Sequence, residues 1–230
     1  MLTVMGETRR RPEHLNTRTP PGDDVTQRSD LKPAFSDDLF ERVLQRHNLQ
    51  VAWKRVRANK GAAGIDGMTI DEFPVWAKSG HWKRVVIELE TGRYKPSPVR
   101  RVEIEKPDGG TRQLGIPTVT DRVIQQAIAQ VLTPIFDPDF SNNSFGFRPH
   151  RNGQQAVQQV HGIIKEGRRI AVDVDLSKFF DRVNHDLLMT YLGRKVKDKR
   201  LLKLINRYLR AGVIDNQFYS ESREGVPHQK

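Results

Sequence analysis

The sequence predicts an α+β fold, and three observations lead to that class. Several segments space their apolar residues three and four positions apart, as amphipathic helices do. Between residues 99 and 117 the pattern changes to apolar residues alternating with charged ones on either side of the turn sequence PDGG, which predicts a β-hairpin. A further run, IAVDVDL, has the length of a strand and is apolar enough to be buried.

Composition limits the classes of function. The chain has 230 residues, no cysteine, and 39 Lys and Arg against 28 Asp and Glu, for a formal net charge of +11. Disulfides and thiolate metal sites are therefore excluded. No apolar run approaches the roughly 18 residues of a membrane span, so we expect a cytoplasmic protein with no membrane partner. An acidic membrane surface would also attract this charge, but the cations form no single amphipathic stripe, and nucleic acid is the favoured partner.

The N-terminal third predicts a leader followed by helices. Residues 1–34 are polar and contain TPPGDD, which indicates a flexible leader. Asp38 and Glu41 have capping-box spacing at the start of a helical pattern that suits one helix or two short ones around Asn48. After the glycine-rich loop GAAGIDG, Thr69 and Glu72 indicate a second helix start. A third helix, WKRVVIELE, is expected to end at the glycine that follows it.

The hairpin predicted for residues 99–117 carries Lys106 and Arg112 on its two arms. Cations beside a tight turn can close over a polyphosphate, Lys as a point charge and Arg as a planar fork. Equally, Lys and Arg protect the exposed edges of a solvated hairpin. Position alone favours this second interpretation.

Beyond the hairpin, the spacing in DRVIQQAIAQVLTPIF predicts a helix, and a long irregular loop follows it. In that loop Phe145 and Phe147 alternate with Arg148 and Arg151. Aromatic rings interleaved with arginine suit base stacking and phosphate contact. The same phenylalanines could instead anchor the loop to the core. Further helices are predicted for QQAVQQVHGIIKEG, HDLLMTYLG and DKRLLKLINRYLRAG.

The aspartates of IAVDVDL are the strongest chemical signal. On a strand, Asp173 and Asp175 would point to one face, and Val172 and Val174, which alternate with them, to the other. A buried carboxylate needs a cation, a hydrogen-bond donor or a metal. Mg²⁺ suits a carboxylate at a strand end, because it takes few protein oxygens together with water and phosphate. Structural aspartates held by hydrogen bonds are the alternative.

Five stretches together resemble one family, the reverse transcriptase/maturase proteins of bacterial group II introns. They are NKGAAGIDGMTIDEF, VRRVEIEKPDGGTRQLGIPTVTDRVIQQAIAQVL, FSNNSFGFRPHRNGQQAV, IAVDVDLSKFFDRVNHDLLM and EGVP, in the family's order. The resemblance implies a right-hand polymerase fold, with residues 35–168 as the fingers region and residues 169–230 as a partial palm. It also implies DNA synthesis on an RNA template and the binding and splicing of intron RNA.

The resemblance assigns roles to the singled-out residues. Asp175 would bind the two Mg²⁺ ions, with help from the Leu176 carbonyl, and Phe180 would exclude a 2′-hydroxyl from the nucleotide site. Lys106 and Arg112 would grip the incoming deoxynucleoside triphosphate. The loop with Phe145, Phe147, Arg148 and Arg151 would lie along the RNA template and DNA primer.

The chain departs from the family pattern in one respect. Two-metal phosphoryl transfer needs carboxylates on both sides of the ion pair, and the family supplies the others from a Tyr-Ala-Asp-Asp hairpin. No adjacent aspartates follow Asp175, and after EGVP the chain reads HQK. We therefore expect a fragment truncated before the second catalytic carboxylate hairpin and inactive alone.

Two alternatives remain open at this stage: a non-catalytic module that binds intron RNA, and a reverse transcriptase of a bacterial defence or diversification system. An incomplete palm would also expose apolar surface. We therefore expect self-association, through the apolar face of RLLKLINRYL.

Overall fold

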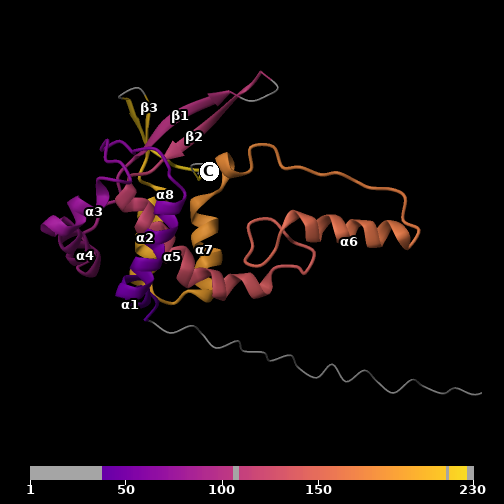
Figure 1. Ribbon diagram of the computed structural model, residues 1–230, viewed down its shortest axis with the longest axis horizontal. Helices are drawn as coiled ribbons and strands as arrows, with labels where there is room; N and C mark the ends of the chain where they lie inside the picture. Colours follow the sequence, from indigo (N-terminus) through magenta and orange to yellow (C-terminus); the bar gives the residue numbers. More distant parts are fainter. Residues whose placement is uncertain (1–37, 106–108, 216–217, 227–230) are drawn as a thin grey trace, which may run out of the picture. The chain divides into compact units, whose positions relative to one another are not determined.

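The computed structural model describes residues 38–105, 109–215 and 218–226, so the leader predicted for residues 1–34 lies outside the described residues. Helices and a mixed sheet confirm the predicted α+β class (Figure 1). The elements are α1 (Leu39–Leu44), α2 (Arg46–Ala58), α3 (Phe73–Trp76), the π-helix η1 (Ala77–His81), α4 (Trp82–Glu90), β1 (Val99–Glu105), β2 (Thr111–Ile116), α5 (Val119–Phe136), the 3₁₀ helix η2 (Asp137–Asp139), α6 (Gly153–Lys165), the 3₁₀ helix η3 (Phe180–Arg182), α7 (His185–Lys195), α8 (Lys199–Leu209), β3 (Val213–Asp215) and β4 (Phe218–Ser220).

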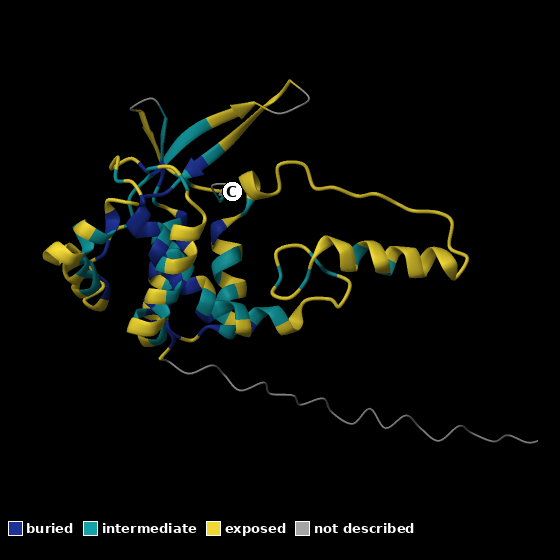
Figure 2. Cartoon of the chain, in the orientation of Figure 1, coloured by how far each residue is buried: buried dark blue, intermediate teal, exposed yellow. Residues whose placement is uncertain are grey.

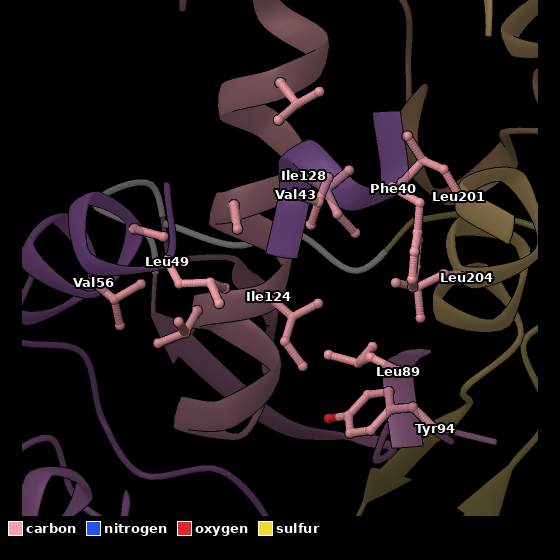
Figure 3. Close-up of a cluster of buried hydrophobic side chains, with 14 of the residues drawn as sticks. Phe40, Val43, Leu49, Val56, Leu89, Tyr94, Ile124, Ile128, Leu201 and Leu204 are labelled. Carbon is pink, nitrogen blue, oxygen red and sulfur yellow. The ribbon is translucent and has the colours of Figure 1, made fainter. Parts of the chain in front are cut away.

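Helix α5 is the centre of the hydrophobic core. Its N-cap is Thr118, whose hydroxyl accepts a hydrogen bond from the Asp121 N–H, and its apolar face is buried as the spacing predicted. Helices α1, α2 and α8 supply the surrounding side chains, including Phe40, Leu49 and Leu201 (Figure 3). Burial of apolar surface is the main favourable term in folding, so this cluster is the main source of the stability of the fold.

The helix ends agree with the sequence predictions in part. Thr69 and Glu72 form the expected reciprocal cap, each accepting from the other's backbone N–H. The capping box predicted for Asp38 and Glu41 is wrong: α1 has no side-chain cap, and Glu41 pairs with Arg200 instead. The break between α1 and α2 falls at Gln45, and not at Asn48.

The predicted hairpin is present as β1 and β2, which pair antiparallel, with Ile104 opposite Arg112. The four-stranded sheet has the order β2-β1-β3-β4, and β3 lies parallel to β1. Strands β3 and β4 were not expected from the sequence, because three-residue strands carry too little alternation to be recognised.

The buried carboxylate of Asp121 connects three parts of the fold. Oδ1 of Asp121 accepts hydrogen bonds from the hydroxyls of Tyr94 (2.7 Å) and Tyr208 (3.1 Å). Oδ2 accepts from the Thr118 hydroxyl (2.7 Å) and the Ser97 N–H (3.2 Å). Burial raises the pKa of Asp121 above its ordinary value, and these donors oppose that rise. The network ties α5 to α8 and to the segment that leads into β1.

The buried strand predicted at IAVDVDL is wrong. The segment is extended and exposed, with Ile170 90%, Val172 83% and Val174 80% exposed (Figure 2). No strand among the described residues pairs with it. A strand forms only where a neighbour satisfies its backbone groups and covers an apolar face, so the hydrophobicity of the run alone could not place it in a sheet.

The surface predicted for self-association is also wrong. Leu201, Leu204 and Leu209 of α8 are buried in the core, so that apolar face is already covered. Exposed apolar side chains instead occur on α6, none of whose residues is buried, and on the extended segment after it (Figure 2). Among the described residues, no helix is both long enough and apolar enough to span a bilayer.

Candidate functional site

The hairpin of β1 and β2 is anchored at its base and exposed at its tip. The Arg100 guanidinium donates to the Ala63 carbonyl from Nε (3.2 Å) and Nη2 (2.8 Å), which holds the base against the GAAGIDG loop. Burial decreases from Val99 and Gly115 toward the turn, and Arg112 is exposed. Lys106 lies outside the described residues. The Arg112 side chain is therefore presented to solvent on a strand whose other end is fixed.

Asp175 and Leu176 lie on the exposed segment that precedes η3. Oδ1 of Asp175 accepts a hydrogen bond from the Leu176 N–H at 2.9 Å, a local contact within the same segment. Both residues are exposed, as is Asp173. Within the described residues, Asp175 and Arg112 share no hydrogen bond or ion pair, so the structure does not bring these two predicted site residues into contact.

Phe180 begins η3, and the backbone there is joined to the EGV sequence near the end of the described chain. The Val226 N–H donates to the Phe180 carbonyl (2.7 Å), and the Gly225 N–H donates to the Val183 carbonyl (2.8 Å). Gly225 has φ +82°, and a Cβ there would lie 2.7 Å from the Asp181 carbonyl oxygen. Only glycine allows this close approach without strain. Two motifs distant in sequence therefore lie side by side.

The arginines of the loop between η2 and α6 form contacts with the loop itself and with η2. The Arg148 guanidinium donates to the Asp137 carboxylate (2.9 Å) and to the Ser141 carbonyl (2.7 Å), and its side chain is only 8% exposed. This pair lowers the pKa of Asp137 and raises that of Arg148. Arg148 thus holds the loop closed.

The other predicted residues of this loop differ in their surroundings. Arg151 lies over the Phe145 ring at 5.3 Å and donates to the Asn142 carbonyl. Phe147 is fully exposed and has φ +55°. Of the four, Phe147 is the side chain most open to a ligand.

The residues present fit a magnesium site only in part. Within the described ranges, no group of three or more acidic or histidine side chains converges on one point. Mg²⁺ is commonly held by one or two carboxylates plus water and substrate phosphates. Asp175 and the Leu176 carbonyl would supply one side of such a site, and the remaining ligands would have to come from elsewhere.

His185, the first residue of α7, joins this helix to the EGV sequence. His185 is buried, and its Nε2 lies 2.7 Å from the Gly225 carbonyl oxygen, while the buried Nδ1 has no partner among the described residues. The contact between α7 and the EGV sequence spans 40 positions. No local pattern could have indicated it.

Comparison with known proteins identifies the family. The model of the reverse transcriptase (RNA-dependent DNA polymerase) family matches residues 104–228, which is more than half of the chain. The chain belongs to the reverse transcriptase family. The match includes most of the hairpin, the Asp175 segment and η3.

Curated relatives include proteins of group II introns. The group II intron-encoded protein LtrA of Lactococcus lactis subsp. cremoris is 35% identical over 192 residues, which cover 82% of this chain and 31% of that protein. Protein YkfC of Escherichia coli (strain K12) is 34% identical over 203 residues, covering 82% of this chain and 51% of that one. Nuclear intron maturase 1, mitochondrial, of Arabidopsis thaliana is 33% identical over 94 residues, covering 41% and 13%. The chain thus spans about half or less of these relatives.

A solved structure shows the same fold. A chain of a partial Cas6-RT-Cas1–Cas2 complex superposes with a TM-score of 0.54 at 21% identity, over 82% of this chain and 31% of that one. The likeness supports the reverse transcriptase fold for this α+β unit.

Proposed function

We propose that this chain forms the fingers of a group II intron reverse transcriptase and the part of its palm that carries Asp175. Its reaction class is DNA synthesis on an RNA template, together with the binding of intron RNA. The observation that carries the proposal is the family match, which includes in one segment Arg112, Asp175 and Phe180. The relatives named for group II introns support the choice of intron RNA.

Asp175 and the Leu176 carbonyl would hold Mg²⁺ on one side. The bound ions would supply the electrostatic stabilisation that phosphoryl transfer requires. Asp175 is exposed, and among the described residues its carboxylate accepts a hydrogen bond only from the neighbouring Leu176 N–H, so oxygen lone pairs remain for a cation. This segment would have to join a sheet to fix the carboxylate in place, because an extended, solvated segment cannot hold a ligand within the tolerance of catalysis.

Arg112 would bind the triphosphate of the incoming nucleotide. Its strand is fixed at the base through Arg100 and exposed at the tip, which suits a guanidinium that closes over phosphates. We assign Lys106 the partner role across the turn. Phe180 is half exposed and packs edge-on against Phe179 at 5.3 Å, and it would exclude a 2′-hydroxyl by its bulk.

We further propose that this 230-residue polypeptide does not catalyse synthesis by itself. Its sequence contains no pair of adjacent aspartates after Asp175. A two-metal site with ions roughly 3.5–4 Å apart needs carboxylates on both sides. Asp175 alone leaves the second side without protein ligands.

Primer extension tests the proposed inactivity of the isolated chain. A DNA primer on an RNA template is incubated with Mg²⁺, deoxynucleotides and either the parent chain or its Asp175→Ala variant, with Asp173→Ala as the matched control. We expect no extension by any of the three proteins. Extension by the parent and by Asp173→Ala, but not by Asp175→Ala, would mean that a second copy completes the metal site.

A second candidate function is a non-catalytic module that binds intron RNA, favoured by the net charge of +11. Such a module should bind RNA with the same affinity after Asp175→Ala, and its affinity should fall steeply with salt. In the polymerase interpretation, Asp175→Ala should abolish Mg²⁺-dependent stabilisation of the complex with primer, template and nucleotide. Filter binding with and without Mg²⁺ separates the two functions.

A further inference from the structure

A pocket of about 420 Å³ lies between α2 and the segment formed by α3, η1 and α4. None of the site residues discussed above lines it. Its walls are apolar and aromatic, with Leu49 and Trp53 from α2, and Phe73 and Trp82 from the facing segment. The volume is within the range of small-ligand sites, roughly 300–1,000 Å³.

The aromatic walls have a defined geometry. The Trp53 and Phe73 rings are 4.6 Å apart and tilted by 32°, and Trp82 meets Phe73 edge-on at 5.6 Å. Phe73 is buried, so it holds both indoles in place, while Trp53 and Trp82 remain partly exposed. Flat indole surfaces at the edge of an apolar pocket suit a planar aromatic ligand.

The polar groups of the pocket lie at its rim. Arg46 and Gln50 line it, and both are exposed. Within the described part of the chain, neither side chain has a hydrogen-bond partner. A guanidinium and a carboxamide together offer donors and an acceptor to the edge of a heterocyclic base.

The helix that carries this rim is strongly basic. Helix α2 has Arg46, Lys54, Arg55 and Arg57 and contains no acidic residue. Arg57 lies four positions after Trp53, and thus on the face of α2 that lines the pocket. An apolar peptide could fill the pocket but would leave these charges without counterions. A nucleic acid strand satisfies both, because it carries planar bases and a phosphate on every nucleotide.

We propose that this pocket holds one unstacked base of a single-stranded RNA, with the neighbouring phosphates along α2. The base packs against the partly exposed indoles of Trp53 and Trp82, and Arg46 and Gln50 bind its edge. The inference rests on the proposed RNA-binding function and adds to it a base subsite distant in sequence from Asp175. Stacking of a base on aromatic side chains contributes about 5- to 150-fold in affinity.

Fluorescence titration tests the subsite. The chain has three tryptophans, and two of them line the pocket, so a stacked base should quench the intrinsic emission. The probe is an oligoriboadenylate of about 12 nucleotides, a length within the range of single-strand sites. An abasic strand of the same length carries the phosphates without the bases. We expect both strands to bind the parent chain and only the oligoriboadenylate to quench.

Ala77→Met is the main variant, because Ala77 lines the pocket and a longer side chain would fill it. We expect it to weaken oligoriboadenylate binding at least about fivefold, to abolish quenching and to leave abasic-strand binding unchanged. Trp76→Leu is the matched control, since Trp76 belongs to the same aromatic cluster but lies outside the pocket lining. Arg46→Gln, an exposed change that should not affect folding, is expected to weaken oligoriboadenylate binding and reduce its salt dependence.

The outcomes are distinguishable. If Ala77→Met and Arg46→Gln bind the oligoriboadenylate as tightly as the parent, with the same quenching, the subsite is refuted while RNA binding stands. If the parent binds neither strand, the proposed RNA-binding function fails, and the inference fails with it. If Ala77→Met leaves RNA binding intact but changes the sedimentation of the protein, the pocket is a contact between copies and the proposal is wrong.

Discussion

Replacing Asp121 with alanine tests whether the buried carboxylate network holds the unit together. The change removes the acceptor of four donors, the hydroxyls of Thr118, Tyr94 and Tyr208 and the N–H of Ser97. A buried donor left without a partner costs about 1–3 kcal/mol. Because the three hydroxyls can rotate, we take the lower part of that range for each and expect a loss of about 3–5 kcal/mol in the free energy of unfolding.

Urea unfolding followed by far-UV circular dichroism measures this loss directly. The Asp121→Asn variant is the matched control, because it keeps the volume and a carbonyl acceptor while removing the charge. It should cost less than Asp121→Ala. A loss below about 1 kcal/mol for Asp121→Ala, the size of a typical single hydrogen bond, would refute the idea that this network ties α5 to α8.

The difference in stability between the parent and Asp121→Asn should depend on pH, with a definite sign. Burial raises the pKa of Asp121 in the folded state, so the folded protein binds this proton more tightly than the unfolded chain does. The resulting stabilisation is fully present below the ordinary carboxylate pKa and is lost as pH rises through the raised value. The stability of the parent relative to Asp121→Asn should therefore increase as pH falls from neutral. An unchanged difference between neutral and acidic pH would contradict the assignment.

Three further predictions concern other parts of the chain. Gly225→Ala should lower the urea midpoint of unfolding more than Gly67→Ala does. Both glycines have positive φ, but of the two only Gly225 would bring a Cβ against backbone, 2.7 Å from the Asp181 carbonyl oxygen. Equal midpoints for the two variants would argue against a close approach at Gly225. Val172→Lys combined with Ile164→Lys should reduce concentration-dependent association in sedimentation, because both side chains are exposed apolar groups, whereas unchanged association would place the contact elsewhere. Arg148→Ala should release the loop between η2 and α6, because the guanidinium joins Asp137 to the loop carbonyls, and faster amide exchange at residues 141–147 would report the release; unaltered exchange would mean that other contacts hold the loop.

Local patterns predicted the parts of the fold that local forces determine. The hairpin, the Thr69–Glu72 cap and the buried face of α5 depend on turn chemistry, capping and helical period, which neighbouring residues encode. The failures depend on distant partners. Glu41 pairs with Arg200, 159 positions away, in place of capping α1. The run at IAVDVDL has strand composition, but a strand needs a pairing neighbour that composition cannot supply.

The candidate site was predicted mainly by resemblance. Alternation could place Asp173 and Asp175 on one face, but it could not choose between metal binding and a structural role. The exposed Arg112 on a fixed strand is consistent with the predicted location, and its role stays a prediction, as do those of Asp175 and Phe180. The ion pair of Arg148 with Asp137 was not predicted, because the sequence does not indicate which partner an arginine will find, and the nucleic-acid role of Arg148 also stays a prediction.

The most direct test of the central claim is primer extension by a hybrid protein. Residues 38–226 of this chain would replace the matching part of the Lactococcus lactis group II intron-encoded protein, which supplies the segments that follow. The hybrid should extend a DNA primer on an RNA template with Mg²⁺, lose all synthesis on Asp175→Ala and retain it on Asp173→Ala. A folded hybrid that still extends the primer after Asp175→Ala would contradict the assignment of Asp175 as the metal-binding carboxylate.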